Sequence, residues 1–180
     1  MKLWLVRHAQ VLLPPGICYG ATDVAADAAA TLSAALALAA ELPQGLGLRV
    51  SPLQRCEQLA LVLQGLRPDL AYKTDAGLVE MDFGHWEGQA WSTIPQSALD
   101  AWVADFASHR FGGSESVADV MHRVALAWDV TWQAGQDAAW ITHAGVIRAA
   151  SLLHQGVRQV QRADQWPKEG PAFGRWLTLG

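Results

Sequence analysis

Cysteine is scarce in this sequence. The two cysteines, Cys18 and Cys56, belong to no paired or metal-binding motif, which fits a reducing compartment with no disulfide framework and no zinc site. Long hydrophobic runs are also missing. Four strongly apolar residues stand in a row before Arg7, too few for the core of a signal peptide, and no other run approaches the length of a membrane span. The sequence therefore predicts a cytoplasmic protein with no membrane-spanning segment.

Charge is scarce as well. Charged residues make up 17% of the chain and the net charge is −4, so the composition offers no broad basic surface for nucleic acid or an anionic membrane. A negatively charged substrate would have to be attracted by a local cluster of arginines. The apolar fraction of 51% and the length of 180 residues are typical of a globular chain with its own core. We expect a single domain over residues 1–180.

Short apolar runs alternate with helical patterns along the chain. Runs of strand length lie at residues 2–6, 46–50, 70–74, 138–142 and 175–179. Helical patterns lie at residues 26–41, 53–63 and 146–154, with helical pieces broken at Pro95 between residues 91 and 106. Ser116 is expected to open a long helix, with Asp119 completing a partial capping box. This alternation predicts an α/β fold with a mostly parallel sheet.

Two of the predicted strands run directly into a histidine. The first ends on Arg7 and His8, and the strand at 138–142 ends on His143. Arg55 lies at the start of a helix just after a third strand. Ligands of open α/β sheets bind at the carboxyl ends of the strands. If these strands are neighbours, the four side chains converge at one edge of the sheet.

Such a cluster suits a phosphoryl group. Two arginines can grip a phosphate through paired N–H···O contacts, and they stay charged at any relevant pH. A helix N-terminus after His143 adds backbone donors for the same anion, and Ala144 is a predicted phosphate contact. A histidine ring nitrogen can attack phosphorus, so His8 is the predicted covalent nucleophile. Gln10 is predicted to contact the phosphate as well.

Phosphoryl transfer also needs a proton for the leaving oxygen. Residues 80–88 are dense in acidic side chains, and Glu80 is the best candidate for the general acid. The residues alone do not choose cleanly among Glu80, Asp82 and Glu87. His85 and Glu87 could mimic a metal-binding pair, but no third ligand has a convincing spacing, so no metal site is predicted.

Aromatic side chains offer two interpretations. Four of them could stack on an aromatic base in a substrate, namely Tyr19, Trp86, Trp91 and Trp102. Nine tryptophans in a chain of this size more often serve packing in the core and at its rim. Cys56, on the apolar stripe of its helix, is interpreted as a small buried hydrophobe.

Several segments together resemble the histidine phosphatase superfamily, the phosphoglycerate-mutase-like proteins. Residues 6–10 (Val-Arg-His-Ala-Gln) are similar to its Arg-His-Gly motif, and residues 51–58, which include Arg55, are similar to its second motif. Residues 80–88 resemble the acid/base segment, which favours Glu80, and residues 142–148 resemble the segment with the second histidine. Residues 113–116 are close to the family's Gly-Gly-Glu-Ser. The motifs follow the family order from residue 2 to about 150.

The resemblance implies a phosphoglycerate mutase-like fold, three-layer α/β/α with a central, mostly parallel sheet. It implies that His8 becomes phosphorylated, that Glu80 protonates the departing alcohol, and that water then releases phosphate. Arg7, Arg55 and His143 would bind the transferred group throughout. No cofactor or metal is implied, because cationic side chains provide the charge stabilisation.

Within the superfamily, residues 14–23 and the short acid segment are most similar to the α-ribazole phosphatases, which act late in cobalamin biosynthesis. The expected partner is a small phosphorylated metabolite, with α-ribazole 5′-phosphate as the specific candidate. Ala9, Gln10 and Pro14 stand where the family more often has glycine, glutamate and asparagine, so substrate choice is expected to differ more than chemistry.

Three alternatives remain open. The chain could hydrolyse another small metabolite such as a sugar phosphate, act on protein phosphohistidine, or bind a phosphate ligand without catalysis. The retained nucleophile, arginines and acid argue against the binding module.

Overall fold

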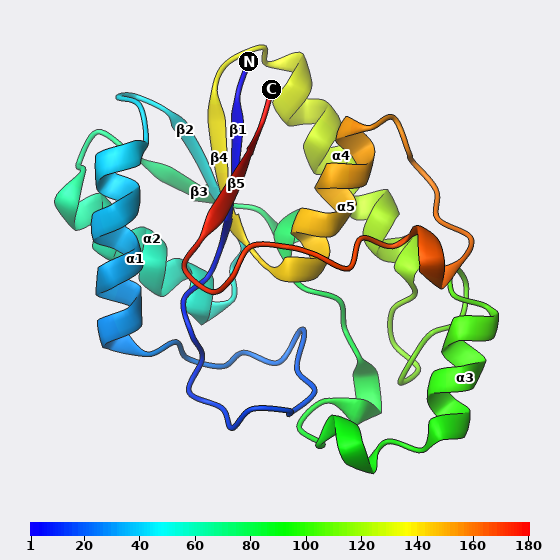
Figure 1. Cartoon of the computed structure of the whole chain (residues 1–180). Helices are drawn as coiled ribbons and strands as arrows, with labels where there is room; N and C mark the ends of the chain where they lie inside the picture. Colours follow the sequence, from blue (N-terminus) through cyan, green and yellow to red (C-terminus); the bar gives the residue numbers. More distant parts are fainter.

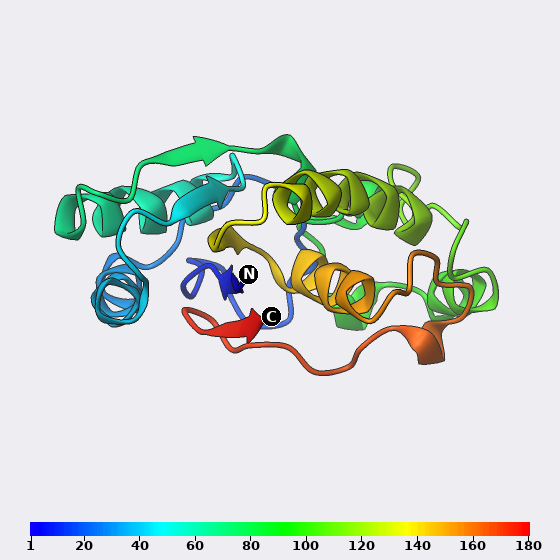
Figure 2. The same cartoon turned by 90° about the horizontal axis from the view of Figure 1, so that it is seen from above.

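A five-stranded sheet runs through the middle of the molecule, with helices on both faces (Figure 1; Figure 2). The computed structural model describes residues 1–180. The strand order is β3-β2-β4-β1-β5, and β5 alone runs antiparallel to its neighbour. The strands are β1 (Leu3–Arg7), β2 (Gly47–Val50), β3 (Tyr72–Thr74), β4 (Ala138–Thr142) and β5 (Trp176–Leu179). The predicted three-layer α/β/α fold with a mostly parallel sheet is confirmed.

The two faces of the sheet bury separate apolar clusters. Helices α1 (Ala28–Glu41) and α2 (Gln54–Leu66) cover one face, and α4 (Val117–Gln133) and α5 (Ala144–His154) cover the other (Figure 2). Along β1, Leu3 and Leu5 pack with α4 and α5, whereas Trp4 and Val6 pack with α1 and α2. Because successive strand residues point to opposite faces, a strand covered on both sides reads as a continuous apolar run.

The long helix α4 begins after Ser116, as the sequence predicts. Ser116 is its N-cap, and the side chain of Asp119 accepts from the Ser116 backbone in a complete capping box. One face of the helix is buried against the core, through Val117, Val120, Met121, Val124 and Trp128. The predicted break at Pro95 separates a short 3-10 turn (Trp91–Thr93) from α3 (Gln96–Ala104). Helix α5 begins at Ala144, earlier than predicted, because His143 itself is the extended N-cap residue.

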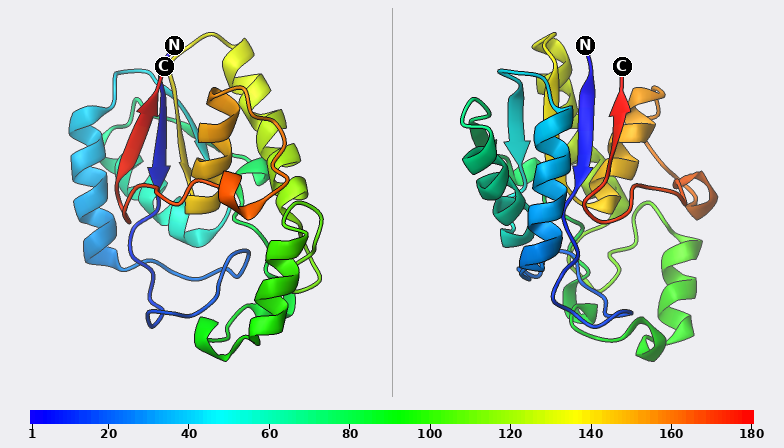
Figure 3. Two further views of the ribbon diagram at one scale, coloured as in Figure 1. Left: turned by 45° about the vertical axis from the view of Figure 1, so that its right-hand side comes forward. Right: turned by 60° about the vertical axis from the view of Figure 1, so that its left-hand side comes forward.

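A third cluster lies beyond the carboxyl ends of the parallel strands, where α3 stands clear of the sheet (Figure 3). Its centre is Phe111, which stacks on Trp102 at 4.5 Å between ring centroids and on Trp91 at 6.0 Å. The loop after β1 joins this cluster through Cys18, whose backbone N–H donates to Gln89 O at 2.8 Å. These residues form a wall that faces the strand ends. None of the helices has the length and hydrophobicity of a membrane-spanning segment.

Candidate active site

The carboxyl ends of β2, β4 and β1 lie side by side, because these strands are neighbours in the sheet. A cavity of about 280 Å³ opens at this edge. The sequence-predicted residues that line it are Arg7, His8, Arg55, Glu80, His143 and Ala144. Residues from distant parts of the chain, between positions 7 and 144, therefore meet around one space.

His8 is held with one ring nitrogen free. The side chain is 2% exposed, and its Nδ1 lies 2.8 Å from the carbonyl oxygen of Ala9. A carbonyl can only accept, so Nδ1 carries the hydrogen and Nε2 keeps its lone pair. Burial, with the positive charges of Arg55 and Arg7, lowers the pKa of His8 to about 3. Because no residue other than glycine has a positive φ, Ala9 needs no glycine torsion.

His143 is a neutral ring of fixed orientation. The side chain is buried, its Nδ1 accepts from Arg55 Nε at 3.2 Å, and its Nε2 lies 2.8 Å from Ser51 Oγ. Since Arg55 can only donate, Nε2 carries the hydrogen and donates to Ser51. Burial, followed by the charge of Arg55, holds the pKa of His143 well below its usual range. The rings of His8 and His143 lie 5.2 Å apart between centroids.

Arg55 is fully buried and connects three parts of the chain. Besides the bond to His143, Nη1 donates to Thr22 O at 2.8 Å and Nη2 donates to Gly20 O at 2.5 Å. A guanidinium has five N–H donors, so two remain for an anion in the cavity. Arg55 thus fixes the loop after β1 and still has donors facing a ligand.

Arg7 and Arg148 hold further unused donors. The Arg7 guanidinium stacks on the ring of Phe173 at 3.8 Å, and Nη1 donates to Pro171 O at 3.2 Å. The Nε atoms of Arg7 and Arg148 are buried without a hydrogen-bond partner. Buried donors normally find acceptors, and the oxygens of a bound phosphate can supply them. Sequence reasoning missed Arg148 as a site residue, although it follows Ala144 by one helical turn and so shares its face of α5.

Glu80 is the acid that lines the cavity. Its Oε1 accepts from the backbone N–H of Met81 and its Oε2 from that of Gly145, both at 3.0 Å. A Cβ at position 145 would lie 2.3 Å from Oε1, so the close approach of the carboxylate to α5 requires glycine there. Its position at the cavity therefore favours Glu80 over Asp82 and Glu87 as the general acid.

The two other candidate acids stabilise loops instead. Asp82 Oδ1 accepts from Gly84 N at 2.8 Å. The Glu87 carboxylate accepts from the backbone N–H groups of Ala21, Thr22 and Phe83 at 2.6 to 3.0 Å. Burial opposes ionisation of Glu87, but a hydrogen bond from the Thr22 hydroxyl and these backbone hydrogen bonds together outweigh it and lower its pKa. Neither side chain lines the cavity.

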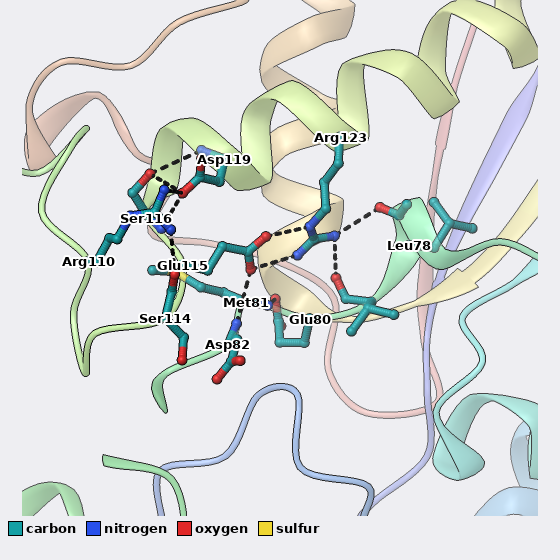
Figure 4. A network of polar contacts seen from close by, with 12 residues as sticks. Leu78, Glu80, Met81, Asp82, Arg110, Ser114, Glu115, Ser116, Asp119 and Arg123 are labelled. Atoms are coloured by element: carbon teal, nitrogen blue, oxygen red, sulfur yellow. Dashed lines mark hydrogen bonds and ion pairs between the residues drawn. The ribbon is translucent and has the colours of Figure 1, made fainter. Parts of the chain in front are cut away.

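The segment that carries Glu80 is anchored on both sides by a half-buried ion pair between Arg123 and Glu115 (Figure 4). Arg123 of α4 donates Nη1 to Gly77 O at 2.9 Å and to Val79 O at 2.5 Å. Its Nε donates to Glu115 Oε1 at 2.7 Å, and Glu115 Oε2 accepts from Asp82 N at 3.0 Å. The chain is thus fixed immediately before and after Glu80. Glu115 takes no part in the capping box that Ser116 and Asp119 form at the start of α4, and binds Arg123 instead.

Gln10 is one predicted contact that the structure does not bring to the cavity. Its side chain is exposed, while its backbone carbonyl accepts from Asp27 N at 2.7 Å. Of the aromatic candidates, Tyr19 and Trp91 line the cavity, whereas Trp86 and Trp102 do not. No group of three or more His, Cys, Asp or Glu side chains is placed to hold a metal ion.

Comparison with known proteins adds a family and a set of structural neighbours. The sequence profile of the histidine phosphatase superfamily (branch 1) matches residues 3–168. No curated protein sequence matches the chain. A mycobacterial glucosyl-3-phosphoglycerate phosphatase in complex with VO3 is similar with a TM-score of 0.80 and 25% identity, over 99% of this chain and 92% of that chain. The protein TTHB049 from Thermus thermophilus is similar with a TM-score of 0.71 and 27% identity, over 99% and 93%.

Proposed function

The chain belongs to the histidine phosphatase superfamily, and from this premise we propose that it hydrolyses a small phosphomonoester through a phosphohistidine at His8. At the level of the family it is a phosphoric monoester hydrolase. The observation that carries the proposal is the neutral His8 ring, whose Nδ1 is bound to Ala9 O so that the Nε2 lone pair is free.

Each step can be assigned to residues around the cavity. Arg7 and Arg55 hold the phosphoryl oxygens, and their N–H groups stabilise the charge that develops on them, while His143, whose one N–H donates to Ser51, orients Arg55 beside the phosphoryl group. Nε2 of His8 forms a bond to phosphorus as the bond to the alcohol oxygen breaks. Glu80, in its protonated form, gives its proton to that oxygen. The resulting carboxylate takes a proton from water, which attacks phosphorus, releases phosphate and restores the His8 lone pair.

The specific substrate that we propose is α-ribazole 5′-phosphate, the compound suggested by the resemblance of residues 14–23 to the α-ribazole phosphatases. A sugar phosphate is the second candidate. The mycobacterial neighbour, named as a glucosyl-3-phosphoglycerate phosphatase, favours it at 25% identity.

A panel of phosphomonoesters tests both levels of this proposal. The panel contains α-ribazole 5′-phosphate, glucosyl-3-phosphoglycerate, a phosphohistidine domain and a generic aryl phosphate, each assayed with a chelator present. We expect turnover with chelator, and an acid-labile phosphate on the quenched protein that is missing in His8→Asn. Phosphate binding without any turnover would instead identify a binding module. Preference for another ester would refute the α-ribazole assignment alone.

A further inference from the structure

A second cavity, of about 470 Å³, adjoins the phosphate cavity. Glu80, Trp91 and Arg148 line both spaces, so the second cavity begins where the alcohol oxygen of a bound phosphomonoester would lie. Its other walls come from the aromatic cluster, from the first turns of α4 and from residues 163–168. A space of this size can enclose a small organic group.

The lining of this cavity is apolar and rich in rings. Phe83, Trp102, Phe106 and Trp166 contribute aromatic side chains, in addition to the shared Trp91. No hydroxyl or amide side chain lines it. Its charged groups are the shared Glu80 and Arg148, together with Lys168.

We propose that this cavity binds the alcohol part of the substrate and selects a flat aromatic group over a polyhydroxylated sugar, with Trp166 as a specificity-determining residue. The inference rests on the proposed function, which places the scissile phosphate in the neighbouring cavity. Aromatic surfaces pack favourably against a planar apolar group. The hydroxyls of a sugar would lose water here without finding side-chain partners, which disfavours their binding.

Trp166 can act on specificity without supporting the core. It follows the short 3-10 turn Ala163–Gln165, is half-buried, and meets Phe106 edge-on at 6.1 Å between centroids. Arg148 Nη2 donates to Lys168 O at 3.2 Å and so ties this segment to α5 beside the phosphate cavity. The sheet and its two apolar clusters are formed without the indole ring as a central member.

Two matched pairs of esters test the selection. 2-Naphthyl phosphate and phenyl phosphate have leaving groups of similar basicity, as do 2-phenylethyl phosphate and glucose 6-phosphate. We expect kcat/KM to be about tenfold higher for 2-naphthyl phosphate than for phenyl phosphate, and about tenfold higher for 2-phenylethyl phosphate than for glucose 6-phosphate. In both pairs the preferred ester has the larger aromatic group to bind in the second cavity. Trp166→Ala should reduce both ratios to near one, mainly through KM. Trp132→Ala is the control, since this indole lies on α4, stacks on Trp128 and lines neither cavity.

The outcomes separate the two proposals. Ratios near one in the unmodified chain, a preference for glucose 6-phosphate, or ratios unchanged by Trp166→Ala would overturn the aromatic selection and leave the phosphatase assignment standing. If no ester is turned over, the phosphatase assignment fails. The cavity is then tested by binding of 2-naphthylmethyl phosphonate and methyl phosphonate. About tenfold tighter binding of the naphthyl compound supports the cavity assignment, and equal binding refutes it.

Discussion

Replacing Gly145 with alanine should slow catalysis while leaving the stability of the fold almost unchanged. The added Cβ would lie 2.3 Å from Glu80 Oε1, closer than non-bonded atoms can approach. Gly145 has ordinary helical torsions, so the backbone itself accepts alanine. The obstructing atom is the end of a flexible side chain, and we therefore expect the carboxylate to move away.

The size of the effect follows from the required displacement. Ordinary contact demands that the Glu80 oxygen shift by roughly 1 Å, and a misplacement of this size can cost about 10²-fold in rate. The hydrogen bond from Gly145 N–H to Oε2, now 3.0 Å, would also lengthen. Alanine in place of glycine within a helix stabilises it by up to about 1 kcal/mol. The gain from alanine and the loss from the weakened hydrogen bond are of similar size, so the rate should fall while the free energy of unfolding changes little.

The assay compares phenyl phosphate with 4-nitrophenyl phosphate, whose leaving group needs little protonation. Gly145→Ala should reduce kcat for phenyl phosphate about 10²-fold and for the nitrophenyl ester much less. Gly65→Ala is the control, because position 65 lies in α2 with nothing within 4 Å of an added Cβ, so its Tm should rise without a kinetic change. An unchanged kcat for phenyl phosphate, or equal losses for both esters, would refute Glu80 as the proton donor.

Other predictions concern the groups around the same cavity. His8→Asn should lose at least about 10³-fold in rate, and activity near that of the unmodified chain would exclude it as nucleophile. Glu87→Gln should lower stability in urea by about 1 kcal/mol but kcat by less than about tenfold, since it fixes a loop outside the cavity. Arg123→Met should lower kcat for phenyl phosphate by at least about tenfold with KM little changed, because it releases the segment that carries Glu80. An equal loss of kcat for 4-nitrophenyl phosphate would contradict this, because it would indicate that the whole active site has become less ordered. Since burial lowers the pKa of His8 and His143, the unfolded chain binds more protons below about pH 6.5. The free energy of unfolding in urea should therefore fall from pH 7 to pH 5, by up to about 1.4 kcal/mol per pH unit for each ring, and a flat profile would contradict this.

The strand-end residues could be predicted because their signals are local. Apolar runs of strand length fix where β1 and β4 end, and Arg7, His8 and His143 follow those ends directly. That these residues meet depends on one nonlocal fact, the adjacency of β2, β4 and β1 in the sheet.

Other parts of the site depend on contacts that no local pattern announces. Arg7 stacks on Phe173, more than 160 residues away, and the sequence marks no pairing between them. Gln10 was wrongly expected at the cavity, because the chain turns there and its carbonyl bonds to Asp27 N. The choice between Glu80 and Glu87 likewise depends on distant partners, since the loop at Ala21 satisfies Glu87.

Apart from Glu80, Trp91 and Arg148, which line both, the two cavities are built from different parts of the chain. Groups at the strand ends hold the phosphoryl side, whereas residues 83–106 and 163–168 supply most of the rings around the neighbouring space. Substitutions in those peripheral segments can alter which alcohol fits while the sheet and its reactive imidazole remain as they are. The architecture therefore allows the repertoire of substrates to drift, or to be redesigned, without rebuilding the chemistry.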